Sequence, residues 1–231
     1  MSSPLRSARD RARSEVRSAI LDKAREHLAV EGAAGLSLRA VARDLGLVSS
    51  AVYRYFANRD ALLTALIVDA YDSLGDATDA AVAEAAGRPA AQRWVAGAEA
   101  VRTWASAHLQ EYALLYGSPV PGYAAPDDTV VPGTRVSIAL VQVVRDAYDA
   151  GAVAPGATLA PGPVTTPELE RLAGLLGTTL PAPVLFAALL AWTQLFGLLT
   201  FELFGQTRGI VDDHAAFFHD AAAAMAAHIG L

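Results

Sequence analysis

Apolar residues recur three and four positions apart over most of the chain, which predicts one amphipathic helix after another. The first of these runs from near Ser14 to near Glu31, and Gly32 and Gly35 then favour a helix end. Alanine, the best helix former, supplies much of a hydrophobic content of 53%. We therefore expect an all-α protein with a large core.

Residues 36–63, LSLRAVARDLGLVSSAVYRYFANRDALL, contain two short helical patterns joined by a turn at Gly46. Ser37 is a good N-cap for the first pattern, and the second covers about Ser49–Tyr55. Asn58 then caps a longer helix. This arrangement predicts a helix-turn-helix, a unit that places its second helix in the major groove of DNA.

Charge is divided unevenly along the chain. Residues 1–65 carry 11 Lys and Arg against 7 Asp and Glu, whereas residues 66–231 carry 7 against 17. A basic head on an acidic body directs the head towards a polyanion, although chance variation of a solvated surface is the alternative. We predict a flexible basic arm over 1–13, which contacts DNA or is simply a loose terminus, and a DNA-binding domain over 14–65. A helical ligand-binding and dimerisation domain follows over 66–231.

The body alternates helical patterns with Pro- and Gly-rich breaks. Helices are predicted over 90–116, where the pattern allows a kink, and over 134–150, and the breaks cover 117–133 and 151–167. Three further helices are predicted. The first is capped by Thr166 and has Pro167 at its first position, the second opens at Pro181 and Pro183, and the last opens at Asp212 or Asp213.

One of these helices is apolar all round. Pro183–Phe201 is a stretch of 19 residues without a charge, close to the length of about 20 that spans a bilayer. Its polar residues and the lack of a flanking basic cluster favour a soluble reading, in which one stripe packs on its own domain and the other on a second subunit. A membrane-associated protein is the rival. The predicted dimerisation residues are Leu185, Leu189, Leu199 and Leu203, with Phe217, Ala221 and Met225 of the last helix.

The segment Val16–Leu66 resembles the N-terminal DNA-binding domain of the TetR family of bacterial regulators, in its helix order and its AVYRYF and NRDALL runs. The remainder resembles the WHG subtype of C-terminal domain, whose namesakes stand here as Trp104, His108 and Gly117. The run AWTQLFGLLTFELFG is similar to the dimerisation helix of that subtype. The resemblance implies a homodimeric, ligand-responsive regulator, most often a repressor, on a palindromic operator in double-stranded DNA.

The chain departs from the family pattern at three positions of the helix-turn-helix. Val48 stands where Ser or Thr usually caps the second short helix, Arg59 replaces Lys, and Tyr55 replaces a common His. Arg59 keeps the positive charge of the lysine, and the hydroxyl of Tyr55 can donate a hydrogen bond to a phosphate. The residues expected to contact DNA are Arg39, Ser49, Ser50 and Arg54 in or near the groove, and Tyr53, Tyr55 and Arg59 on phosphate. Core packing is the alternative for each tyrosine, and a solvated charge is the alternative for Arg54.

Aromatic residues of the body, with a few polar ones, suit a pocket for a small lipophilic effector. Aromatic residues at helical spacing are more often plain core, and His108 more often satisfies a local hydrogen bond. The candidate ligand contacts are Trp104, His108, Tyr112, Tyr116, Tyr123, Trp192, Gln194 and Phe196.

Other classes of function find little support in the sequence. Cysteine is absent, and no hydrolase, zinc-protease, Walker or dinucleotide-binding motif occurs, so neither an enzyme nor a cofactor is expected. The acidic and histidine residues over 212–220 lie at a predicted helix start and do not favour a metal. No signal peptide is predicted, which favours the cytoplasm. The alternative function is a helical small-molecule-binding or assembly protein that does not bind DNA.

Overall fold

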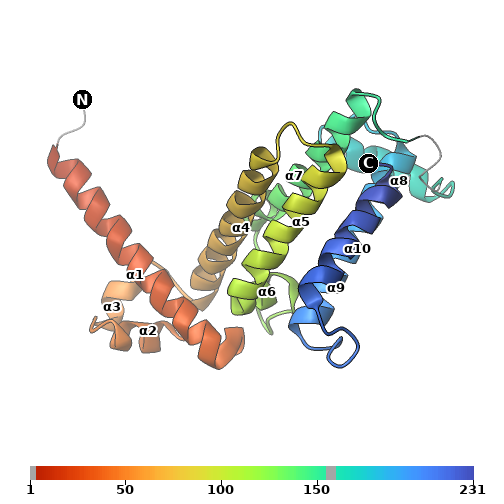
Figure 1. The fold of residues 1–231 in the computed structure, drawn as a ribbon. Helices are drawn as coiled ribbons and strands as arrows, with labels where there is room; N and C mark the ends of the chain where they lie inside the picture. Colours follow the sequence, from red (N-terminus) through yellow and green to blue (C-terminus); the bar gives the residue numbers. More distant parts are fainter. Residues whose placement is uncertain (1–3, 155–159) are drawn as a thin grey trace. The chain divides into compact units, whose positions relative to one another are not determined.

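The computed structural model describes residues 4–154 and 160–231, with side chains from Asp10 onward. These residues form ten α-helices and one short 3-10 helix and contain no strand, which confirms the all-α prediction (Figure 1). The chain divides into two compact units. Unit 1 holds the chain through Tyr71 together with His108–Val131, and unit 2 holds Asp72–Ala107 and Pro132–Leu231.

Unit 1 begins with a helix longer than the sequence predicts. α1 starts at Pro4 rather than near Ser14, so residues 4–13 are helical and not a flexible arm, because Ala, Arg and Leu propagate a helix well and Pro suits its first turn. Residues 1–3 of the predicted arm lie outside the described residues. The unit comprises α1 (Pro4–Gly35), α2 (Leu38–Asp44), α3 (Ser49–Tyr53), the first half of α4 (Arg59–Glu84), α6 (Leu109–Tyr116) and the 3-10 helix η1 (Asp127–Thr129).

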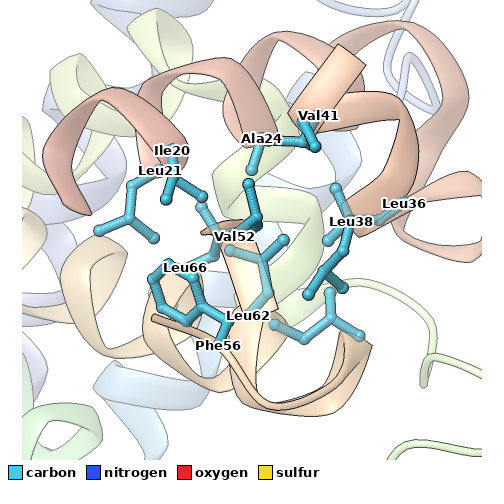
Figure 2. Close-up of a cluster of buried hydrophobic side chains, with 12 residues drawn as sticks. Ile20, Leu21, Ala24, Leu36, Leu38, Val41, Val52, Phe56, Leu62 and Leu66 are labelled. Carbon is cyan, nitrogen blue, oxygen red and sulfur yellow. The ribbon is translucent and has the colours of Figure 1, made fainter. Parts of the chain in front are cut away.

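The core of unit 1 draws on all four N-terminal helices. Figure 2 shows Ile20 and Ala24 of α1, Val41 of α2, Val52 of α3 and Leu62 of α4 converging on one buried cluster. Apolar residues from much later in the chain pack against this cluster, so α6 and the loop after it complete the same core. These later residues are Leu114, Val120 and Tyr123.

Unit 2 is a bundle built around the apolar helix. α10 packs against both α5 and α9, and α8 packs against α9 (Figure 1). Arg102 of α5 forms a two-pronged ion pair with Glu202 of α9, with nitrogen–oxygen distances between 2.6 and 3.0 Å. The helices of unit 2 are the second half of α4, α5 (Ala90–Ala107), α7 (Val130–Asp149, whose first two residues belong to unit 1), α8 (Thr165–Leu175), α9 (Ala182–Leu203) and α10 (His214–Ile229).

Several predicted boundaries move. The pattern over 90–116 is two helices, since the backbone at His108 leaves the helical region. α7 starts at Val130, inside the predicted break, because the first turn of a helix tolerates the missing N–H of Pro132. α8 starts at Thr165 after Val164, which makes no side-chain cap, rather than with a cap from Thr166.

α9 is the only helix among the described residues that is long and apolar enough to cross a membrane. In its most apolar window, 44% of the residues are buried inside the structure, and the helix packs against α5, α8 and α10. A buried core helix of a soluble protein passes the same test of length and composition, so the finding is weak support for a membrane span.

Candidate nucleic-acid interface and ligand cavity

The helix-turn-helix is fixed by local hydrogen bonds and by a buried valine in its second helix. The Ser37 hydroxyl accepts the Ala40 N–H at 3.5 Å, which caps α2 as predicted. Gly46 adopts a left-handed φ of 67°, and the Leu47 N–H then reaches the Ala42 carbonyl at 2.9 Å, so the chain turns out of α2. Val52, fully buried, holds α3 against the core.

α3 presents most of its predicted DNA-contacting residues to solvent. Ser50, Tyr53 and Arg54 are exposed and Ser49 is partly buried, while Arg39 is exposed on α2. These positions match the requirement that a reading helix keep polar groups free for base edges and phosphates.

A groove of about 540 Å³ runs between α1 and α3. Arg13 and Val16 of α1 line it together with Arg54 and Tyr55 at the end of α3. The structure therefore brings the guanidinium groups of Arg13 and Arg54 to the same groove, which favours an anionic occupant. Arg13 was expected only as part of a basic arm.

Two of the predicted phosphate contacts have structural partners. Tyr55 is partly buried and packs against the unit 1 core, and Arg59 donates to the Ala33 carbonyl at 2.7 Å, which satisfies the end of α1. Arg59 also lies 3.7 Å from the Asp60 carboxylate. Contact of either residue with DNA stays a prediction.

The turn exposes an apolar residue where the family pattern has a capping Ser or Thr. Val48 is 70% exposed and is the N-cap residue of α3, with no side-chain hydrogen bond to the helix. An exposed methyl-bearing side chain at the start of a reading helix can contact the methyl group of thymine. A valine between a turn glycine and two serines is the sequence signal that could have suggested this.

Two polar contacts tie α1 to the rest of unit 1. The His27 Nε2 lies 2.7 Å from Asp44 of α2, and this hydrogen bond lowers the pKa of the Asp44 carboxyl. Arg25 lies at the centre of a larger network. Its guanidinium bonds Asp22 of α1 at 2.6 Å, Asp69 of α4, and Glu111 of α6 at 3.0 Å.

The three tyrosines among the predicted ligand contacts in unit 1 are packed or already bonded. Tyr112 is fully buried, and its ring lies 5.2 Å from that of Tyr116, which makes an edge contact with Tyr71. Burial raises the pKa of Tyr116. The Tyr123 hydroxyl is 2.9 Å from the Thr64 hydroxyl, while His108 is exposed at the start of α6.

In unit 2 the predicted ligand contacts lie in different places. Trp192 lines a cavity of about 210 Å³ and its ring lies 5.3 Å from that of Phe196. Trp104 is buried elsewhere and donates to the Ser73 hydroxyl at 2.9 Å, whereas Gln194 lines a separate groove. The predicted residues therefore do not form one pocket, and their contact with a ligand stays a prediction. The cavity instead adds residues that the sequence did not single out, among them Trp94, Thr134, Ser137, Leu172 and Ala188.

An exposed apolar surface lies on α9 and α10, and it corrects part of the predicted dimer face. Leu185, Leu199 and Met225 are at most 1% exposed, so they pack inside their own unit and offer nothing to a partner. The open groove is formed by the other stripe of α9, which includes Phe201, and by Phe217 of α10. Of the remaining predicted residues, Leu189 and Phe217 are exposed and Leu203 and Ala221 are partly buried.

Within 10–154 and 160–231, no group of three or more His, Cys, Asp and Glu side chains could hold a metal ion. Two of the histidine and acidic residues near α10 have other contacts. Asp213 caps α10 by accepting the Ala216 N–H at 2.9 Å, as predicted, and His219 bonds Glu99 of α5 at 2.6 Å.

Comparison with known sequences gives matches over both parts of the chain. Residues 20–66 match a family model described as bacterial regulatory proteins, tetR family, and residues 94–225 match one described as the tetracyclin repressor-like C-terminal domain. The HTH-type transcriptional regulator Rv1816 of Mycobacterium tuberculosis is 41% identical over 196 residues, which cover 84% of this chain and 83% of the relative.

Comparison with solved structures agrees. The crystal structure of SCO4313, described as a regulatory protein, is 36% identical with a TM-score of 0.77, over 94% of this chain and 97% of that one. A protein of unknown function from Rhodococcus sp. RHA1 is 27% identical with a TM-score of 0.71, over 93% and 95% of the two chains. The same fold occurs, at 17% identity and a TM-score of 0.60, in a TetR family regulator from Shewanella sp. PV-4.

Proposed function

Because the chain belongs to the TetR family of bacterial transcriptional regulators, we propose that it acts as a cytoplasmic homodimeric repressor. It binds a palindromic operator in double-stranded DNA and releases it when a small lipophilic effector enters unit 2. The observation that carries the proposal is the helix-turn-helix of unit 1, with Ser50, Tyr53 and Arg54 of its reading segment exposed.

The DNA part of the proposal rests on cationic and polar side chains that are exposed on the helix-turn-helix of unit 1. Arg54 and Arg13 line one groove, and Arg39 on α2, the preceding helix of the motif, is also exposed. An arginine with free donors can read guanine, and loss of such a contact costs about 1–3 kcal/mol, which is roughly a five- to 150-fold loss of affinity. A single small domain makes too few contacts for tight specific binding, so two copies are required.

The test is DNase footprinting on the DNA upstream of its own gene, followed by gel shifts with variants. We expect a protected palindrome with half-site centres about 34–36 Å apart. Arg54→Ala should weaken binding, whereas Arg145→Ala, on α7 in unit 2, should not. Absence of a protected palindrome would contradict the proposal, as would equal binding by Arg54→Ala, which would favour a ligand-binding or assembly protein with no DNA function.

The dimer part rests on the apolar groove of α9 and α10. Phe201 is 54% and Phe217 is 47% exposed, and water-exposed phenyl groups that line one groove are typical of an interface. We expect Phe201→Glu and Phe217→Glu to sediment as monomers and to lose operator affinity. Leu175→Glu, at a leucine of α8 that is 85% exposed and does not line this groove, is the matched control and should remain a dimer. A native protein that sediments as a monomer at micromolar concentration would rule the dimer out.

The regulatory part rests on α4. This helix runs unbroken from Arg59 to Glu84 and so belongs to both units, with its N-terminus in the DNA-binding unit and its C-terminus in the unit that holds the 210 Å³ cavity. A ligand that favours one position of α4 in unit 2 thereby shifts the population of DNA-competent molecules. The fixed spacing of the two half-sites tolerates little misfit, so a small change in the spacing of the two helix-turn-helix domains of the dimer suffices to release one of them from DNA.

A further inference from the structure

The groove between α1 and α3 in unit 1 carries positive charge from both helices. Arg13 of α1 lines it together with Arg54, the C-cap residue of α3, and with Tyr55, which follows Arg54 in the chain. The volume of the groove is about 540 Å³, and no Asp or Glu is among the residues that line it. Because two guanidinium groups share this space without a carboxylate, they repel each other until an anion enters.

Both guanidinium groups are open to an external partner. Arg13 and Arg54 are exposed, and their side chains form no ion pair or hydrogen bond with any residue that the structure describes. Other arginines of unit 1 are already paired, since Arg25 bonds three carboxylates and Arg43 bonds Asp44 at 3.3 Å. The N–H donors of Arg13 and Arg54 therefore remain available for an anion that enters the groove.

Arg13 is carried by a helix that is anchored close by, rather than by a loose arm. α1 is helical from Pro4, and Val16, three residues after Arg13, packs against the core of unit 1. One turn beyond Arg13, the guanidinium of Arg17 lies over the Phe56 ring, 5.5 Å from its centroid. The position of Arg13 relative to α3 is therefore fixed within unit 1, as a contact that positions DNA requires.

We propose that this groove holds the phosphodiester backbone of DNA beside each half-site, with Arg13 as a phosphate contact that α1 supplies from outside the helix-turn-helix. The inference rests on the proposed function, because it adds a contact to the same DNA interface. Arg54 in this groove belongs to the reading segment, so the anion that reaches both arginines is DNA itself. A guanidinium binds a phosphate through two parallel hydrogen bonds that carry no sequence information. Arg13 therefore strengthens binding to every sequence and fixes the register of α3 on the duplex.

The test combines the salt dependence of binding with the removal of single phosphate charges. Dissociation constants of the native protein, Arg13→Gln and Arg11→Gln are measured by fluorescence anisotropy from about 50 to about 200 mM salt, on the footprinted operator and on a duplex of unrelated sequence. Arg11→Gln is the matched control, since Arg11 is also exposed on α1 but does not line the groove. A methylphosphonate scan of the operator then neutralises one phosphate at a time.

Each phosphate that a cation neutralises contributes about 0.9 to the slope of log K against log salt concentration, so losing one contact per half-site should reduce the magnitude of this slope by about 2 in Arg13→Gln. Its affinity should fall by the same factor on both duplexes, about three- to ten-fold for each half-site. One methylphosphonate position should weaken binding of the native protein by a similar factor and affect Arg13→Gln less than about two-fold. Arg11→Gln should behave as the native protein does, and urea unfolding should give all three proteins the same stability.

Four results would overturn the inference. A slope change in Arg11→Gln as large as that in Arg13→Gln would show only a general attraction between charges. The absence of any methylphosphonate position whose effect depends on Arg13 would remove the phosphate contact, and a loss of affinity confined to the operator would make Arg13 a base reader. Inorganic phosphate that competes with the operator at constant ionic strength, in the native protein but not in Arg13→Gln, would make the groove a site for a free anion.

Failure of this inference is distinguishable from failure of the proposed function. A protected palindrome with equal salt slopes for the native protein and Arg13→Gln removes only the contact from α1. If no palindrome is protected, the proposed function fails, whereas the slope on the unrelated duplex still shows whether Arg13 contacts the DNA backbone.

Discussion

Arg25 offers the sharpest test of how unit 1 is held together. Its side chain is 29% exposed and bonds carboxylates on three helices, of which Glu111 on α6, at 15% exposed, is the most buried. The substitution Arg25→Met keeps the aliphatic stem, and so most of its packing, and removes the charge. It separates the electrostatic role of the residue from its volume.

The expected loss of stability follows from the exposure of each partner. The contact with Asp22 is an exposed pair three residues apart on one helix and contributes about 0.2–0.5 kcal/mol. The contact with Asp69 is half-exposed and contributes about 0.2–1 kcal/mol. Glu111 is left with a poorly hydrated charge that has lost its partner, which costs about 1–3 kcal/mol. We expect Arg25→Met to destabilise unit 1 by about 1.5–4.5 kcal/mol in total.

The assay is urea unfolding at low and high salt, with hydrogen exchange of the α6 amides to localise the effect. A double-mutant cycle with Glu111→Gln should give a coupling of about 1 kcal/mol that shrinks in high salt. Lys23→Met is the control, because Lys23 pairs only with Glu26 one turn away among the ion pairs of the described residues. Equal losses for Arg25→Met and Lys23→Met, or no coupling to Glu111, would refute the reasoning.

Three further predictions concern local geometry and pH. Gly117→Ala should destabilise unit 1 by about 1–3 kcal/mol in urea unfolding, since its Cβ would lie 2.3 Å from a backbone oxygen. Gly174→Ala, where a Cβ meets nothing within 4 Å, should be neutral or gain up to about 1 kcal/mol, and similar losses at both glycines would count against the steric argument. Val48→Ser should add the missing cap of α3 and stabilise the protein by about 1 kcal/mol, and a loss of stability would show that this turn cannot accept a cap. The hydrogen bond that His219 donates to the Glu99 carboxylate raises the pKa of the imidazole above its ordinary value of 6.5, so the contact stabilises the protein below pH 6.5, and this stability is lost as the pH rises through the raised pKa. NMR titration should show the raised pKa and its return towards 6.5 in Glu99→Gln, and an unchanged pKa in that variant would contradict the assignment.

The sequence predicts the features of unit 1 that depend on neighbouring residues. The caps at Ser37 and Asn58 and the turn at Gly46 are encoded within a few positions, so they are found where the pattern places them. The apolar positions of these short helices, Val41 and Val52 among them, are fully buried, because helical periodicity fixes which side of a helix faces inward.

Features that depend on distant residues are not visible in the sequence. Both stripes of α9 are apolar, so the pattern could not decide which one is buried, and it is packing within unit 2 that covers Leu199 and leaves Phe201 open. The cavity is similarly hidden, since Trp94 and Trp192 meet only after α5 and α9 have folded together.

The composition of unit 1 has a consequence for engineering. Regulators of this kind invite domain exchange, in which the first 70 or so residues of one protein are fused to the effector-sensing part of another. Here Leu114, Val120 and Tyr123 complete the core of the DNA-binding end, although they lie beyond α5 in the chain. A hybrid cut at Tyr71 would inherit these contacts from a foreign sequence, so a functional chimera must transplant His108–Val131 together with the N-terminal helices.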